Sequence, residues 1–80
     1  MEYKIMEIEI FGKDNCPFCD KAKALAERVG HTVEYKQLGQ DFDMGFIATE
    51  FPSARTFPQI KVNGNYCGGY TDYETLVAKL

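Results

Sequence analysis

The chain has 80 residues, 45% of them hydrophobic and 26% charged, which is the balance of a single small globular domain spanning residues 1–80. Its formal net charge of −3, without any run of Lys or Arg, argues against a nucleic-acid partner. No apolar stretch reaches the roughly 20 residues that span a bilayer, and the charged N-terminal residues do not resemble a signal peptide, so we expect a cytoplasmic protein without membrane contact.

The first third of the chain predicts a strand followed by a helix. From Glu7 to Phe11 acidic and hydrophobic residues alternate, which predicts a strand with one buried face and with Glu7 and Glu9 in solvent. Pro17 suits the first turn of a helix, and apolar residues then recur at helical spacing up to Gly30, a residue that favours helix ends. The first unit is therefore a strand, a tight loop and a helix.

A second strand is predicted over residues 32–36, where Val33 and Tyr35 alternate with polar residues. A strand–helix–strand unit of this length favours a right-handed crossover between parallel strands. His31 lies between the helix and this strand, and we expect it to be an exposed loop residue.

Residues 40–51 give the most ambiguous pattern in the chain. Phe42, Phe46 and Ile47 could form one face of a helix, whereas Gly45 disfavours a helix there. We expect the apolar side chains of this stretch to belong to the core or to the wall of a groove.

The last third predicts a hairpin and a helix. Strands are expected at residues 59–62 and 65–68, because the Asn-Gly pair between them is a strong signal for a two-residue hairpin turn. Asp72 is expected to be the N-cap of an amphipathic helix over residues 73–80. The fold class is therefore α/β, with a βαβ unit followed by a hairpin and a C-terminal helix, forming a mixed four-stranded sheet flanked by helices.

The cysteine pair is the clearest chemical feature. Cys16 lies at the predicted start of the first helix, where free N–H groups and the helix dipole favour a thiolate, and Lys13 lies nearby. Cys19 lies one turn further on, on the same face and in a more buried position, so the two sulfurs can form a disulfide. This asymmetry predicts thiol–disulfide exchange in which Cys16 attacks and Cys19 resolves the mixed disulfide.

A metal site is the alternative interpretation of the same pair. A structural zinc site needs four ligands, and only Cys67 and His31 remain, at no recognised spacing. The odd total of three cysteines also argues against a disulfide scaffold. We therefore predict redox chemistry and no metal.

Three motifs in the same order resemble those of the dithiol glutaredoxins. They are Cys16-Pro17-Phe18-Cys19, Thr56-Phe57-Pro58 and Gly68-Gly69-Tyr70-Thr71-Asp72. The similarity runs nearly end to end and is thinnest between Leu38 and Ala54. It implies a thioredoxin-like fold, glutathione as co-substrate and no tightly bound cofactor.

The resemblance also implies a set of glutathione-binding residues. Pro58 is expected to be cis, which leaves the Phe57 backbone open to pair with the cysteinyl part of glutathione. Thr71 and Asp72 match residues that hold the γ-glutamyl end, and Lys13 matches a basic residue near the glycyl carboxylate. The other expected groove residues are Phe18, Thr56 and Tyr70.

Three positions depart from the family pattern. Phe18 stands where many members have Tyr, and Phe57 replaces a Val and adds bulk next to the proline. Cys67 stands where an aliphatic residue is common. We interpret it as a small buried hydrophobe, with a regulatory or glutathionylated thiol as the alternative.

These features together predict a glutathione-dependent thiol–disulfide oxidoreductase that works as a monomer. Its substrates would be protein disulfides and glutathionylated proteins, with ribonucleotide reductase as one candidate partner. A glutaredoxin-like thioredoxin reduced by a flavoprotein reductase is the first alternative, and a metal or iron–sulfur carrier is the second.

Overall fold

The computed structural model describes residues 5–80. Residues 1–4, which belong to the charged N-terminal stretch that does not resemble a signal peptide, lie outside the described part. Seven elements follow one another along the chain. They are β1 (Glu7–Gly12), α1 (Pro17–Arg28), β2 (Thr32–Gln37), α2 (Met44–Glu50), β3 (Gln59–Val62), β4 (Asn65–Gly68) and α3 (Tyr70–Ala78). The predicted order of strands and helices is confirmed, and α2 resolves the ambiguous stretch.

The four strands form one mixed sheet in the order β2-β1-β3-β4. β1 and β2 are parallel, as the crossover rule predicts, while β3 runs antiparallel to both β1 and β4. Asn63 and Gly64 have φ angles of 51° and 84°, the positive values that the predicted two-residue turn requires. The turn is also joined to β1, because the Glu7 N–H donates to Asn63 Oδ1 over 2.9 Å.

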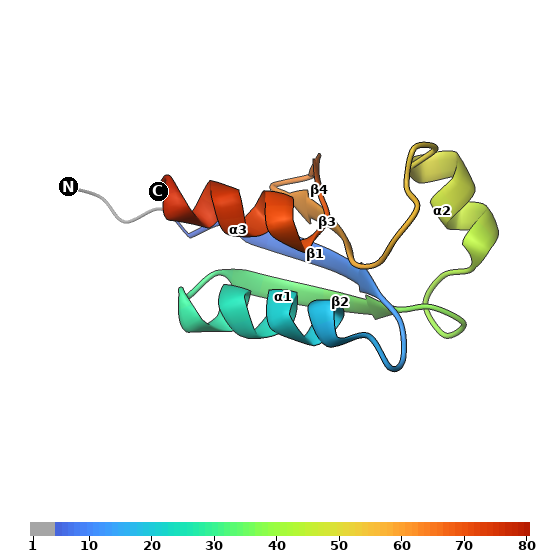
Figure 1. The fold of residues 1–80 in the computed structure, drawn as a ribbon, viewed down its shortest axis with the longest axis horizontal. Helices are drawn as coiled ribbons and strands as arrows, with labels where there is room; N and C mark the ends of the chain where they lie inside the picture. Colours follow the sequence, from blue (N-terminus) through green and yellow to red (C-terminus); the bar gives the residue numbers. More distant parts are fainter. Residues whose placement is uncertain (1–4) are drawn as a thin grey trace.

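Helices α1 and α3 pack side by side on one face of the sheet (Figure 1). The main core lies beneath them, because the inward side chains of β1 and β3 meet the apolar faces of both helices there. Its fully buried members include Ile8, Ile10, Ile60, Ala22 and Tyr73. Burial of this apolar surface is the main stabilising contribution in a domain this small.

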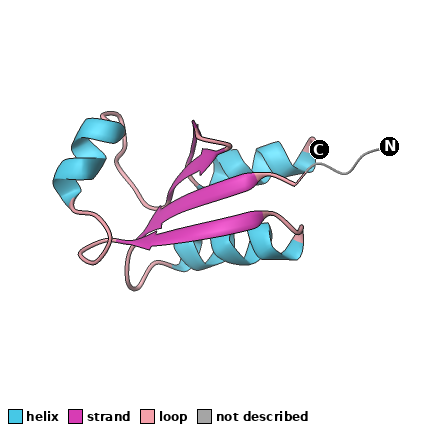
Figure 2. Cartoon of the chain, turned by 180° about the vertical axis from the view of Figure 1, so that it is seen from behind, coloured by secondary structure: helices cyan, strands magenta, loops and turns pink. Residues whose placement is uncertain are grey.

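Helix α2 lies beyond the end of the sheet rather than across its second face (Figure 2). The Asp43 side chain caps it by accepting from the Phe46 N–H over 2.9 Å, which offsets the helix-disfavouring Gly45. Its Ile47 packs with Phe11 and Phe51 in a second, smaller core. Ile47 and Phe51 are buried in this core and Phe42 packs against it, as expected, whereas Phe46 is exposed at its edge, with its ring 5.4 Å from that of Phe11.

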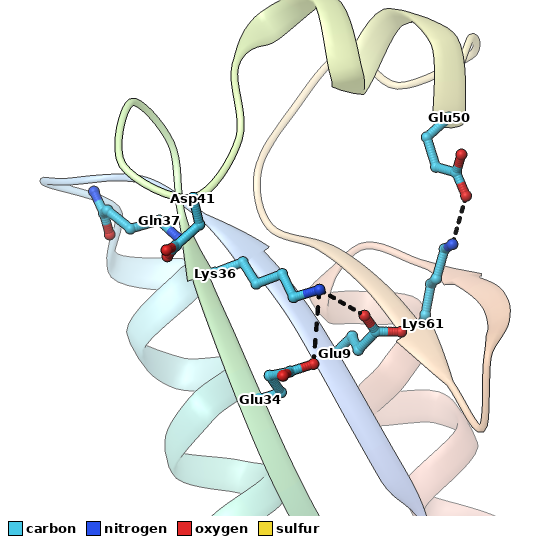
Figure 3. A network of polar contacts seen from close by, with 7 residues as sticks. All are labelled: Glu9, Glu34, Lys36, Gln37, Asp41, Glu50 and Lys61. Atoms are coloured by element: carbon cyan, nitrogen blue, oxygen red, sulfur yellow. Dashed lines mark hydrogen bonds and ion pairs between the residues drawn. The ribbon is translucent and has the colours of Figure 1, made fainter.

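Ion pairs lie on the face of the sheet that α1 and α3 leave open (Figure 3). Lys36 Nζ lies 3.1 Å from Glu9 and 3.7 Å from Glu34, and Lys61 Nζ lies 2.5 Å from Glu50 of α2. Glu9 is thus a paired surface residue, in keeping with its expected solvent-facing position. Such pairs contribute little stability individually, about 0–1 kcal/mol.

The expected exposure of His31 is wrong. The residue is only 8% exposed, and its Nδ1 lies 2.7 Å from the hydroxyl of the buried Tyr73. The chain turns back at Gly30, with a φ of 82°, and this brings His31 beneath α3 instead of into solvent. No local sequence pattern shows this, because the partner is 42 residues away.

His31 gives a prediction about stability and pH. Burial lowers its pKa in the folded chain from the ordinary value of 6.5, so the unfolded chain binds more protons below that pH. The free energy of unfolding should therefore fall as the pH drops from 7.5 through 6.5 and towards the folded pKa. Urea unfolding at pH 7.5 and 5.5 measures this loss.

His31→Gln is the control, because His31 is the only histidine in the chain. The variant should lose less unfolding free energy than the wild type over the same pH interval. Equal losses in both proteins would contradict the assignment.

The start of the last helix also differs from the sequence prediction. Helix α3 begins at Tyr70 with Gly69 as its N-cap, so Asp72 is the third helical residue and not the N-cap. Its Oδ2 accepts from the Gly69 N–H over 3.1 Å, the reciprocal half of a capping box.

Within residues 5–80, no helix is long and apolar enough to cross a membrane.

Candidate active site

Cys16 and Cys19 form a disulfide at the start of α1, with their Cα atoms 5.2 Å apart. Cys16 is the N-cap of the helix, directly before Pro17, as the sequence predicts. The Cys19 N–H donates to Cys16 Sγ over 3.2 Å, so in the reduced form a backbone donor faces the Cys16 sulfur. Such a donor, with the helix dipole, stabilises a thiolate there.

The two cysteines differ in burial. Cys16 is 8% exposed, whereas Cys19 is completely buried. Only the first sulfur is therefore placed for attack by or on an outside partner. The geometry suits the exchange sequence in which Cys16 reacts first and Cys19 closes the internal disulfide.

A groove of about 480 Å³ lies along the loop before β3 and the start of α3. The Phe57–Pro58 peptide bond is cis, as expected from the resemblance, and a Cβ at Gly69 would lie 3.5 Å from the Pro58 carbonyl oxygen. The predicted residues that line the groove are Phe18, Thr56, Phe57, Pro58, Tyr70, Thr71 and Asp72. Three segments distant in sequence thus meet at the groove, and one of them contributes Phe18, which lies between the two cysteines in the chain.

Lys13, the remaining predicted site residue, lies at the margin of this groove. Its Nζ lies 5.6 Å from the centroid of the Phe57 ring, in cation–π range. The additional bulk of Phe57 thus contacts Lys13 as well as the ring of Phe42, whose centroid is 6.4 Å away.

Phe18 is exposed and lines the groove from α1. Its ring centroid lies 5.8 Å from that of Tyr70, and Lys21 Nζ lies 5.1 Å from the Phe18 ring. The ring therefore keeps an aromatic wall next to Cys16 without the hydroxyl of a tyrosine.

Cys67 is half-buried and packs against the main core. Burial, and then the nearby Asp72 carboxylate, raise the pKa of its thiol above the ordinary value. A protonated, packed thiol agrees with the interpretation of Cys67 as a small hydrophobe.

Within the described part of the chain, no three His, Cys, Asp or Glu side chains gather closely enough to hold a metal ion.

The groove includes residues that sequence reasoning did not assign to it. Gln59 and Tyr66 line it from β3 and β4, and Ser53, Ala54 and Arg55 line it from the loop before β3. Arg55 is exposed, and within residues 5–80 its guanidinium donates only to the neighbouring Ala54 carbonyl, which leaves a cation at the groove wall. The sequence offered one signal for a place in the groove, namely that Arg55 and Gln59 lie close to Pro58 in the chain.

The fold and the cysteine pair define a class: a thioredoxin-fold protein with a dithiol–disulfide centre at the N-terminus of a helix. The family model described as glutaredoxin matches residues 8–67. Glutaredoxin from Haemophilus influenzae is 34% identical over 79 residues, covering 90% of this chain and 91% of the relative. The chain belongs to the glutaredoxin family, and this supports thiol–disulfide oxidoreductase activity.

Some of the other relatives are longer proteins. Glutaredoxin-C4 from Arabidopsis thaliana is 33% identical over 69 residues, which are 82% of this chain, and the chain spans only about half of that relative, 51%. The crystal structure of a buckwheat glutaredoxin–glutathione complex has a TM-score of 0.76 over 90% of this chain and 68% of the other, at 23% identity. That likeness shows the thioredoxin-like fold, and the predicted fold class is confirmed.

Proposed function

We propose that the protein is a glutathione-dependent oxidoreductase that reduces glutathionylated thiols and protein disulfides in a reducing compartment such as the cytoplasm. The observation that carries this proposal is the groove that Phe18, from between the two cysteines, helps to line. It joins the Phe57–Pro58 backbone, a helix N-terminus and the Asp72 carboxylate. These groups are the complements of an extended cysteinyl peptide with a free carboxylate and ammonium at one end.

Each part of glutathione has a counterpart in the groove. No hydrogen bond within residues 5–80 uses the Phe57 backbone N–H or carbonyl, so both are free to pair with the cysteinyl residue. The first N–H groups of α3, around Thr71, suit the γ-glutamyl carboxylate, and Asp72 suits the ammonium beside it. Lys13, at the other end, suits the glycyl carboxylate.

The order of the steps follows from Cys16 being the less buried of the two cysteines. The Cys16 thiolate attacks the glutathione sulfur of a glutathionylated protein, and the protein thiolate leaves. A second glutathione thiolate then attacks the Cys16–glutathione disulfide, which releases oxidised glutathione and regenerates the Cys16 thiolate. One free glutathione is consumed for each glutathionylated thiol, because the glutathione taken from the substrate forms the other half of the oxidised glutathione.

Protein disulfides need the second cysteine. Cys16 attacks one sulfur of the substrate and releases the other as a thiolate, and Cys19 then attacks Cys16 to release the reduced protein. Two glutathione molecules reduce the resulting Cys16–Cys19 disulfide. Because the protein is a glutaredoxin, the Cys16–Cys19 pair should have a reduction potential of about −200 to −230 mV.

A comparison of two electron sources tests the proposal. Turnover of a disulfide substrate is measured once with glutathione and glutathione reductase, and once with thioredoxin reductase, each with NADPH. We expect turnover with the first system and little with the second. The reverse result would favour the flavoprotein-reduced alternative, and a coloured protein with bound metal after purification would favour the carrier.

A further inference from the structure

Gln59 is a buried polar side chain that the reaction above does not use. It follows the cis proline directly and is only 3% exposed. Its β1 neighbour in the sheet is Phe11, which belongs to the smaller aromatic core. A buried amide in such surroundings is costly unless both of its ends are hydrogen-bonded.

Both ends of the Gln59 amide do have partners. Its Nε2 donates to the Thr56 carbonyl over 2.6 Å, and its Oε1 accepts from the Tyr66 hydroxyl over 2.5 Å. Tyr66 lies on β4, and its ring packs against Phe51 with centroids 4.9 Å apart. The amide therefore connects the loop before β3 to a tyrosine held in place across the hairpin.

The Thr56 carbonyl belongs to the same peptide group as the Phe57 N–H. In a trans peptide these two groups point in opposite directions, and within residues 5–80 only the Phe57–Pro58 bond is cis. A side chain that holds the Thr56 carbonyl towards the interior thereby turns the Phe57 N–H outwards. That N–H is the one proposed to pair with the cysteinyl residue of the substrate.

We propose that Gln59 and Tyr66 are positioning residues that fix the Thr56–Phe57 peptide group for recognition of the substrate backbone. Tyr66 acts through Gln59, since its hydroxyl orients the amide that holds the Thr56 carbonyl. The pair therefore selects substrates in which the reacting sulfur is part of a peptide. This inference deepens the proposed function and rests on it for the identity of the natural substrate.

The test compares two disulfides that differ in their backbone groups. One is a short, uncharged peptide containing a cysteine mixed disulfide, which can pair with the Phe57 N–H. The other is bis(2-hydroxyethyl) disulfide, which has no peptide group. Second-order rate constants are measured in a single turnover with prereduced protein, so no glutathione or reductase takes part.

Gln59→Met keeps the length of the side chain but removes both hydrogen bonds. We expect the rate constant for the peptide disulfide to fall about five- to tenfold and that for bis(2-hydroxyethyl) disulfide to stay within about twofold. Gln40→Met is the matched control, because Gln40 is exposed and does not line the groove, and both of its rate constants should be unchanged.

Tyr66→Phe is the milder variant and keeps the ring on Phe51. It should lower the peptide rate constant about two- to threefold, and the double variant should be no slower than Gln59→Met alone. If Gln59→Met does not fold, by circular dichroism, the ratio of the two rate constants in Tyr66→Phe decides.

Two results would overturn the inference. Equal slowing on both disulfides would show a general structural role, and no slowing on the peptide would show that the peptide group needs no such support. Additive effects in the double variant would overturn the indirect role of Tyr66. A protein that ignores glutathione but keeps the Gln59-dependent preference for the peptide would contradict only the proposed function.

Discussion

Cys16→Ser should abolish both reduction of glutathionylated substrates and reduction of protein disulfides, lowering turnover by at least about a thousandfold. Cys16 is the less buried member of the pair, and its Sγ accepts from the Cys19 N–H over 3.2 Å. A serine hydroxyl keeps this contact but stays protonated and does not attack a disulfide. The measurement is NADPH consumption with glutathione and glutathione reductase, using a glutathionylated peptide and a protein disulfide in separate assays.

Cys19→Ser should separate the two activities. Reduction of the glutathionylated peptide should persist, because glutathione itself can resolve the Cys16 mixed disulfide. Reduction of the protein disulfide should be lost, because no internal thiol releases the substrate. Loss of both activities in the Cys19 variant would show that the assigned roles are wrong.

Cys67→Ala is the matched control for both serine variants. Its side chain packs against the core and is not among the residues that line the groove. Both activities should therefore remain at the wild-type level. A change in either one would instead support the alternative interpretation of Cys67 as a regulatory thiol.

The fold followed from the sequence where its determinants are local. Alternation in β1 and β2 and the Asn-Gly turn act over a few residues, and each predicted its element correctly. The errors concern long-range or competing contacts. His31 is buried because it hydrogen-bonds to Tyr73, which lies 42 residues away in the sequence. The N-cap of α3 is Gly69 and not Asp72, because the Asp72 carboxylate accepts from the Gly69 N–H three positions earlier.

The same distinction explains what could be predicted of the groove. The segments of the groove that were predicted are short contiguous motifs, so each motif by itself was enough to identify Phe57, Thr71 and Asp72. Gln59 and Tyr66 could not, because their role depends on a hydrogen bond across the hairpin and on the direction of one carbonyl. The position of α2 beyond the sheet was equally hidden, since it depends on how the Phe11 cluster packs.

Asp72 gives the second large expected effect, and it has two roles that must be separated. Its carboxylate lines the groove, and its Oδ2 also accepts from the Gly69 N–H over 3.1 Å. Asp72→Ala removes both functions. It should weaken turnover with glutathione about tenfold, as expected for loss of a charged hydrogen bond, and should also lower the free energy of unfolding by about 1 kcal/mol through loss of the cap.

Asp72→Asn separates these effects, because its amide oxygen can still accept from Gly69 while the charge is gone. We expect stability near the wild-type value, a KM for glutathione raised about five- to tenfold, and an unchanged pH dependence of Cys16 alkylation. Glu27→Gln, an exposed charge change at the far end of α1, should alter none of these. If Asp72→Asn left the glutathione dependence intact while Asp72→Ala lost only stability, Asp72 would be a helix cap alone, and the ammonium of glutathione would have to bind elsewhere.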